Sequence, residues 1–141
     1  LRTKEDQIAL IEGIKKGVID VITSNHQPHE NEIREVEFPI APMGCIGTQI
    51  AFPMALTYLL DELDLETIVK TMSINPRTIL QTDIPVIKEG FVANLTLFDT
   101  HTEWKFDKSS NSSLSENTPM LDSTLKGKVH GTILGNYLHF S

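Results

Sequence analysis

The stretch Ser24-Asn25-His26-Gln27-Pro28-His29 decides the fold predicted for this chain, because it directly follows the apolar run Val18-Ile19-Asp20-Val21-Ile22-Thr23. The run is short and rich in β-branched residues, as expected of a parallel strand that is covered on both faces. Five of the six residues after it, all except Pro28, are polar and of types that ligate metals or bind substrates. In (β/α)8 barrels such side chains follow the carboxyl ends of the strands. We therefore predict a barrel strand at 18–23 that leads into a functional loop.

The length of the chain limits this interpretation. A chain of 141 residues can bury a core, but a complete (β/α)8 barrel needs roughly 250 residues. The sequence also begins with Leu1 rather than Met. We therefore expect one part of a barrel, separated from its earlier strands.

Charge and composition argue against several classes of function. Twelve Lys and Arg against nineteen Asp and Glu leave a net charge of −7. The sequence has no basic stripe that would gather phosphates, so nucleic acid is not an expected partner. No stretch approaches the roughly 18 apolar residues of a membrane span, and no signal-peptide pattern is visible. We expect no membrane association and a cytoplasmic location.

Helical periodicity predicts the elements of the first part. Thr3 is placed to cap a helix from Lys4 to about Lys16, and a second helix is expected from Gly47 to about Leu60. A third helix opens near Asp64 and runs through Met72. A fourth is expected to restart at Asn75, with the Asn as cap and Pro76 in the first helical position.

After Pro85 the apolar period changes from 3.6 to 2, which predicts strands. They are expected at 90–99, around 104–106, at 126–133 and at 137–140, the last two joined by a Gly135-Asn136 turn. The Ser- and Asn-rich residues 107–117 predict a mobile surface loop. We thus divide the chain into a mainly helical part, residues 1–84, and a small β-structure, residues 85–141.

Short motifs follow one another through nearly the whole chain. They are Leu1-Arg2-Thr3, the Asn-His-x-Pro-His loop at 25–29, Pro42-Met43-Gly44-x-Ile46-Gly47-x-Gln49, Ser73-Ile74-Asn75-Pro76-Arg77, Gly90-x-x-Ala93-Asn94-Leu95-Thr96-Leu97-Phe98-Asp99, Asn117-Thr118-Pro119 and Leu125-Lys126-Gly127-Lys128-Val129. In this order and spacing the chain resembles the C-terminal third of dihydroorotases, which belong to the amidohydrolase superfamily.

The resemblance implies an α/β fold: the C-terminal part of a (β/α)8 amidohydrolase barrel plus a small β-sandwich-like lobe. It assigns residues 1–84 to the last strand, substrate loop and closing helices of the barrel, and residues 85–141 to the C-terminal part of the β-lobe. It also implies an activity, the interconversion of carbamoyl-aspartate and dihydroorotate in pyrimidine biosynthesis, on zinc. The family's metal ligands come largely from earlier strands, as a His-x-His pair, a carboxylated Lys and further His. We therefore expect zinc in the full-length enzyme and none bound by this chain.

Asn25 stands where the family has an Asp that touches the metal and shuttles a proton. That chemistry needs a group that cycles between ionised and protonated forms. An Asn amide does not titrate, so we predict a catalytically silent position with weak metal contact or none. The alternative is rescue by other groups.

The resemblance also assigns substrate contacts. His29 matches a histidine that holds the substrate carboxylate, a role that suits a charge-assisted donor; a loop His that caps or packs is the alternative. Met43 and Gly44 match a segment whose backbone grips the substrate, since Gly lets main chain approach a ligand. The alternative there is an ordinary tight turn. His26 has no matched role and is predicted to be structural or solvent-facing.

Three functions remain open from the sequence. The leading one is a segment of a dihydroorotase-like enzyme, inactive as an isolated chain. The second, which Asn25 favours, is a non-catalytic homologue that serves as a structural partner of aspartate transcarbamoylase. Loss of the upstream His-x-His pair and Lys would mark the protein as such a non-catalytic homologue. The third is an independent binding domain, which we disfavour because cut barrel elements would expose wide apolar surfaces and self-associate. A homo-oligomer is expected.

Overall fold

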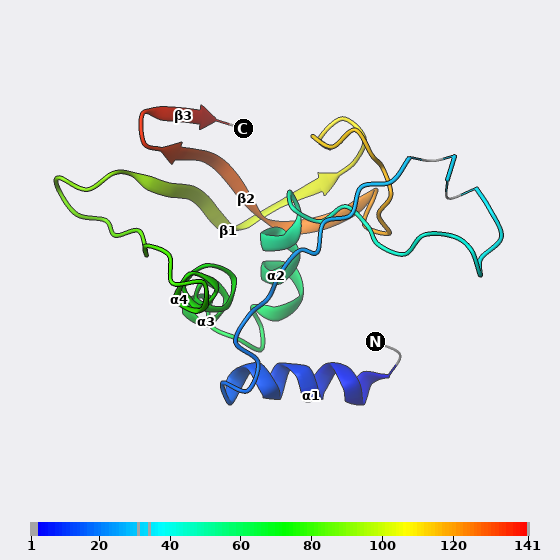
Figure 1. Cartoon of the computed structure of the whole chain (residues 1–141), viewed down its shortest axis with the longest axis horizontal. Coiled ribbons are helices and arrows are strands. Elements are labelled where there is room, and N and C mark those ends of the chain that lie inside the picture. Colours follow the sequence, from blue (N-terminus) through cyan, green and yellow to red (C-terminus); the bar gives the residue numbers. More distant parts are fainter. Residues whose placement is uncertain (1–2, 31, 34, 141) are drawn as a thin grey trace.

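A computed structural model describes residues 3–30, 32–33 and 35–140, so Leu1 and Arg2 of the first motif lie outside the described residues. Helices and strands follow in the order α1 (Lys4–Lys15), α2 (Ala51–Leu59), α3 (Leu65–Val69), the π-helix η1 (Lys70–Ile74), α4 (Asn75–Ile79), β1 (Asn94–Phe106), β2 (Ser123–Leu134) and β3 (Tyr137–Phe140). In this part of the chain the strands form one antiparallel sheet in the order β1-β2-β3. Helix α2 lies between the sheet and α1 in Figure 1.

Helix α1 begins where its sequence predicts. The Thr3 hydroxyl accepts a hydrogen bond from the Asp6 amide at 3.1 Å, and the Asp6 carboxylate accepts one from the Thr3 amide at 3.2 Å. This reciprocal capping box satisfies two amides that have no partner inside the helix. Gly17, at a φ of +67°, follows the end of the helix. Ile11 and Ile14 turn one face of α1 toward the buried core.

Residues 18–23 are not a strand in the described chain, and the assignment made from the sequence is wrong there. A strand requires a neighbouring strand to share its backbone hydrogen bonds, and the described residues place none beside this segment. Instead, the Ile22 amide donates to the Thr71 carbonyl at 3.1 Å. Val18 is 75% exposed, so the expected cover on both faces is also missing. The segment leads to an isolated parallel bridge between His26 and Cys45.

The predicted helix restart at Asn75 is also wrong, because η1 carries the chain from α3 into α4 without a break. The Asn75 amide donates five residues back, to the Lys70 carbonyl, and Pro76 has no amide hydrogen to offer. Thr71 therefore keeps a carbonyl with no helical donor, and Ile22 supplies one. The Asn75 side chain, rather than capping a helix, donates to the Asp20 carbonyl at 2.8 Å. The wide turn thus anchors residues 20–22.

The sheet agrees with the predicted period but not with all predicted bounds. Strand β1 begins at Asn94 rather than at Gly90, and it runs through to Phe106 with an irregularity between Asp99 and Glu103. Gly90 instead lies in a turn, at a φ of +85°. Strands β2 and β3 pair across the predicted two-residue turn, where Gly135 has a φ of +58°.

Buried side chains of the described chain form two clusters that meet on α2. Ile46 and Ile50, before the helix, pack with Phe106 and Leu125 of the sheet. Ala55, Leu56, Leu63 and Ile68 form the second cluster. The Thr57 hydroxyl also accepts a hydrogen bond from the Lys126 amide of β2 at 2.8 Å. Helix α2 therefore joins the sheet to the helices, and the loops before it are held at that junction.

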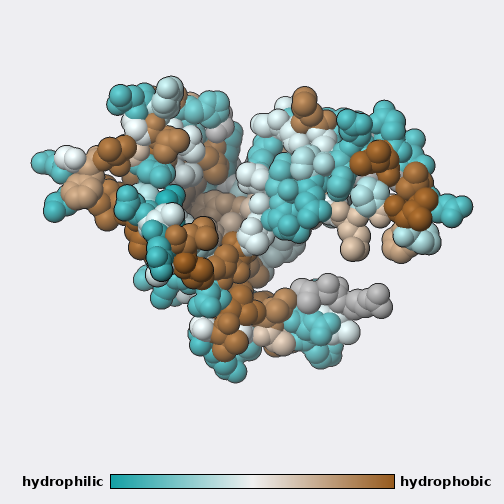
Figure 2. All heavy atoms as spheres, viewed as in Figure 1, coloured by the Kyte–Doolittle hydropathy of each residue, from teal (hydrophilic) through white to brown (hydrophobic). Residues whose placement is uncertain are grey.

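Large apolar side chains also lie on the surface. Phe38 is 95% exposed, Ile87 89% and Tyr137 81%, and Figure 2 shows apolar residues in several separate places on the near face. The prediction of exposed apolar surface concerns the strand and helices assigned to the barrel, where Val18 is 75% exposed, Leu80 72% and Tyr58 57%. Among the helices that the structure describes, none has the length and apolar character to cross a bilayer.

Replacing Gly127 by Ala should destabilise the fold by about 2–4 kcal/mol. A Cβ there would lie 2.2 Å from Leu56 Cδ1, whose residue is buried, and the φ of +85° is unfavourable for Ala. Gly90 is the matched control, since it has the same φ and nothing within 4 Å of a Cβ. Urea unfolding should show a loss of about 1–2 kcal/mol for Gly90→Ala. Equal losses would mean that α2 does not pack tightly on β2.

Candidate functional site

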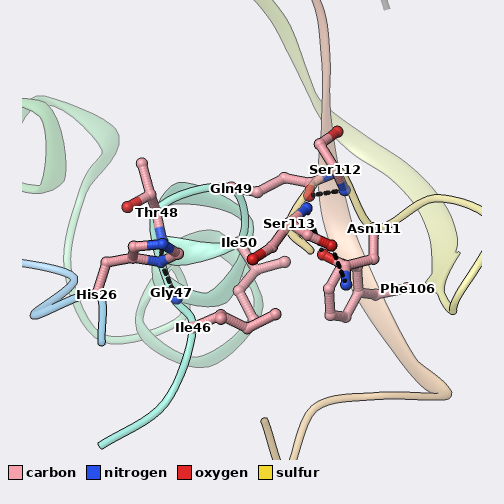
Figure 3. A pocket seen from close by; sticks show the side chains of 10 residues that line it. All are labelled: His26, Ile46, Gly47, Thr48, Gln49, Ile50, Phe106, Asn111, Ser112 and Ser113. Carbon is pink, nitrogen blue, oxygen red and sulfur yellow. Dashed lines mark hydrogen bonds between the residues drawn. The ribbon is translucent and has the colours of Figure 1, made fainter. Parts of the chain in front are cut away.

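The two loops that the sequence singles out lie side by side. His26 and Cys45 form a parallel bridge, and the Gln27 amide donates to the Cys45 carbonyl at 2.9 Å. His26 also reaches forward to the turn before α2: its Nδ1 lies 3.0 Å from the Gly47 amide and 3.3 Å from the Thr48 amide (Figure 3). The loop after residue 24 is thus joined to residues 45–48 at several points.

Two glycines of the second motif make this approach possible. A Cβ on Gly44 would lie 2.3 Å from Gln27 Oε1, and Gly44 has a φ of +118°. A Cβ on Gly47 would lie 2.9 Å from the Ser24 carbonyl oxygen, which belongs to the backbone and cannot move aside cheaply. Any other residue at these positions would push the loops apart. The spacing Gly44-x-x-Gly47 is therefore explained by contact with residues 24–27.

His26 has a structural contact, one of the alternatives predicted for it. Its Nδ1 accepts hydrogen bonds from the two amides, so in the neutral ring the proton lies on Nε2. The ring also lines a cavity of about 260 Å³ with residues of the α2 turn, Phe106 and the 111–113 loop (Figure 3). His26 therefore fixes the turn before α2 to the first loop.

The structure brings together the three residues predicted to bind substrate. His29 Nε2 lies 3.1 Å from the Met43 carbonyl oxygen, next to Gly44. A carbonyl oxygen can only accept, so Nε2 carries the ring proton and donates a hydrogen bond to the Met43 carbonyl. This leaves His29 Nδ1 as the second polar atom of a half-buried ring. The Met43 side chain is 89% exposed, so its backbone rather than its side chain belongs to the cluster.

Asn25 lies at the start of the first loop with a φ of +42°. Among non-glycine residues, Asn and Asp adopt this left-handed conformation most readily, so the backbone suits either. The Asn25 side-chain oxygen Oδ1 accepts a hydrogen bond from Gln27 Nε2 at 3.3 Å, and the backbone amide of Asn25 donates to the Thr23 hydroxyl at 3.5 Å. The side chain is exposed, and its recorded polar contact is with Gln27.

The residues that the structure describes do not by themselves fit a zinc site. Zinc takes three or four converging ligands, and within residues 3–30, 32–33 and 35–140 no three His, Cys, Asp or Glu side chains converge on one point. Asn25 offers a weak amide oxygen that already accepts from Gln27. His26 Nδ1 is engaged by two backbone amides.

A buried residue that the sequence did not mark as a site residue joins the backbones of the two loops. Asn117 is 2% exposed, and its Nδ2 donates to the Gln27 carbonyl at 2.9 Å and to the Gly44 carbonyl at 3.3 Å. Its Oδ1 accepts from the His29 amide at 3.3 Å. The Asn117-Thr118-Pro119 motif was the available signal, but His29 lies 88 residues away in sequence, so spacing could not link the two.

The 107–117 loop has no helix or strand, as predicted, but it is tied to the site. Gln49 Nε2 donates to the Ser110 carbonyl at 2.6 Å. The Ser112 amide donates to Gln49 Oε1 at 2.8 Å, as Figure 3 shows. Asp107 begins the loop, and hydrogen bonds from the Ser109 hydroxyl and the Ser110 amide hold the pKa of its carboxyl below the usual value. The loop is thus ordered by its own polar residues and by Gln49.

Replacing Gln49 by Ala should release the Ser112 amide. One lost hydrogen bond of about 0.5–1.5 kcal/mol corresponds to roughly three- to tenfold faster amide exchange. The measurement is the exchange rate of the Ser112 backbone amide, followed by NMR. Thr48→Ala is the matched control, because it shortens the neighbouring exposed side chain and leaves both hydrogen bonds of Gln49 in place, so exchange at Ser112 should not change. Unchanged exchange in Gln49→Ala would show that Gln49 does not hold the loop.

Comparison with known proteins finds relatives of this chain both in sequence and in structure. No protein-family model matches the chain. A dihydroorotase from Aquifex aeolicus is 43% identical over 135 residues, 94% of this chain and 32% of the relative. The L-hydantoinase (dihydropyrimidinase) of Arthrobacter aurescens superimposes with a TM-score of 0.85 at 26% identity, over 96% of this chain and 32% of that one. An inactive dihydroorotase-like domain of a Chaetomium thermophilum CAD-like multifunctional protein superimposes with a TM-score of 0.68 at 21% identity. This match covers 98% of this chain and 36% of that one.

These matches confirm the predicted fold class, an α/β part of an amidohydrolase barrel with a small β-lobe. The chain spans about a third of the length of the curated relatives it matches. Several such relatives, from different bacteria, carry the same name over nearly the whole chain. Over nearly its whole length the chain is therefore similar to a portion of dihydroorotases, as its sequence motifs predict.

Proposed function

We propose that this chain is the C-terminal segment of a dihydroorotase-like cyclic amidohydrolase that interconverts carbamoyl-aspartate and dihydroorotate. The observation that carries the proposal is the hydrogen bond from His29 Nε2 to the Met43 carbonyl, because it joins the residues matched to substrate binding. The curated relatives named dihydroorotase support it. We further propose a cytoplasmic homo-oligomer, with zinc held by residues of the remaining protein.

The contacts of His29 suggest how it would bind the substrate. With Nε2–H donated to Met43, the ring is fixed in orientation and Nδ1 is the atom left for a ligand. A protonated ring would donate Nδ1–H to a carboxylate, a charge-assisted hydrogen bond. Gly44 has no side chain to obstruct a small ligand beside this ring. The pair thus suits an anionic, carboxylate-bearing substrate.

Asn25 limits what this chain contributes to the reaction. The proposed reaction needs a side chain that moves a proton to and from the ring nitrogen of the substrate, as a carboxylate can. Asn25 can accept or donate a hydrogen bond but cannot carry that proton. The proposed contribution of the segment is therefore substrate binding, with the proton transfer silent or left to other groups.

The purified 141-residue chain should not turn over carbamoyl-aspartate or dihydroorotate, with or without added zinc. The reason is that its described residues supply no converging metal ligands and Asn25 carries no proton. A coupled absorbance assay of both directions measures it. Turnover by the chain alone, above a buffer blank, would refute the proposal for the isolated segment.

In the intact protein, Asn25→Asp should raise kcat by about 10²–10⁴-fold, the usual contribution of general acid–base catalysis. The left-handed backbone at this position accepts Asp as well as Asn. Asn94→Asp is the matched control, since it makes the same change at an exposed residue of β1 and should leave kcat unchanged. No gain in Asn25→Asp, with zinc bound, would argue against an enzyme with one altered residue.

A second candidate function is a non-catalytic partner of aspartate transcarbamoylase. Asn25 favours it, and one structural neighbour is itself described as an inactive dihydroorotase-like domain of a CAD-like multifunctional protein. On this hypothesis the intact protein co-purifies with the transcarbamoylase, and its Asn25→Asp variant shows no dihydroorotase turnover. On the enzyme hypothesis the substitution restores turnover whether or not the transcarbamoylase is present.

A further inference from the structure

We infer that Asn117 is a positioning residue for ligand binding, which fixes the His29 ring against the backbone of Met43 and Gly44. The inference rests on the proposed function, in which His29 binds the carboxylate of the substrate. It adds a residue from the β-lobe side of the chain to the site, between β1 and β2. Asn117 does not touch the proposed ligand and would act through His29.

The amide of Asn117 is used to its full capacity. Its two N–H groups point to the carbonyls of Gln27 and Gly44, at 2.9 and 3.3 Å. Its oxygen accepts from the His29 amide at 3.3 Å and also lies within hydrogen-bond distance of the Ser115 hydroxyl. No other neutral side chain except Gln presents two donors and an acceptor in one plane. The site therefore selects an amide at position 117.

These bonds form a closed circuit with the His29 ring. Asn117 holds the backbone of His29 on one side and that of Gly44 on the other. The ring then spans the same two loops through Nε2 and the Met43 carbonyl. If either backbone moved, the distance from Nε2 to that carbonyl would change with it. The orientation of Nδ1 toward a ligand thus depends on Asn117.

Burial makes the circuit sensitive to the identity of this side chain. Asn117 is 2% exposed, so water cannot readily replace a lost partner. Ser115 adds a second tie, because its hydroxyl lies 2.6 Å from the His29 carbonyl. That hydroxyl has one proton and can donate to His29 or to Asn117 but not to both at once. The same hydroxyl lies 3.3 Å from the His29 amide, which Ser115 therefore shares with Asn117, and of the two residues Asn117 is the one that also donates to the carbonyls of Gln27 and Gly44.

Asn117→Asp tests the inference, because it keeps the shape and one acceptor but turns the two donors into an oxygen that faces two carbonyls. In the intact protein we expect the Kd for dihydroorotate, measured by calorimetry, to rise at least about tenfold, since one misplaced hydrogen-bonded contact to an anion has that order of effect. His29→Ala should raise it similarly, and the double variant should add little. Asn94→Asp, an exposed control with the same charge change, should bind as the wild type does.

An unchanged Kd in Asn117→Asp, or effects of the two substitutions that add in full, would overturn the inference. Should Asn117→Asp fail to fold, Ser115→Ala is the milder variant, with a smaller rise in Kd that again disappears in the His29→Ala background. Additivity there would count against the inference in the same way.

Failure of the proposed function would look different. If the wild-type protein binds no dihydroorotate, the nitrogen-15 spectrum of the His29 ring still tests the positioning role. We expect one tautomer, with the proton on Nε2, in the wild type and in Asn94→Asp. We expect a mixture of tautomers in Asn117→Asp. A single unchanged tautomer in Asn117→Asp would overturn the inference without reference to any ligand.

Discussion

The buried amide of Asn117 is the constraint on which the rest of the site depends. The loops at 25–29 and 42–47 share one isolated bridge rather than a ladder, so most of their backbone groups need other partners. Asn117 meets three of them, at Gln27, His29 and Gly44. His26 meets two more with one ring nitrogen. Side chains here do the work that neighbouring strands do elsewhere.

This arrangement relies on α2 and its core. Ile46 and Ile50 place the turn before α2 against Phe106 and Leu125 of the sheet. The loop from 107 to 117, which begins directly after Phe106, is then within reach of Gln49 and His29. A residue of the β-lobe can thus support a loop of the barrel portion because one apolar cluster spans both. Binding groups and packing are coupled through a short stretch of chain.

Local features could be predicted from the sequence and distant ones could not. The Thr3 cap and the Gly135-Asn136 turn depend on residues within a few positions, and both are as predicted. A strand at 18–23 would need neighbouring strands that the described residues do not supply, so the apolar pattern alone was not enough to predict the structure there. Asn75 looked like a cap because Pro76 follows it, whereas its side chain bonds Asp20, 55 residues away. The contacts of Asn117 are more distant still.

The π-helix η1 has a consequence for how the chain tolerates changes in length. A π turn holds one residue more than an α turn, and here that residue leaves the Thr71 carbonyl to the Ile22 amide. Deleting a single residue between Thr71 and Pro76 would restore ordinary helical pairing at the Lys70 carbonyl, but it would also place Pro76, which has no amide hydrogen, four residues after Thr71. The proline thus keeps the Thr71 carbonyl open to Ile22 in either length of the turn, so the attachment of this distant stretch of backbone does not depend on the surplus residue alone.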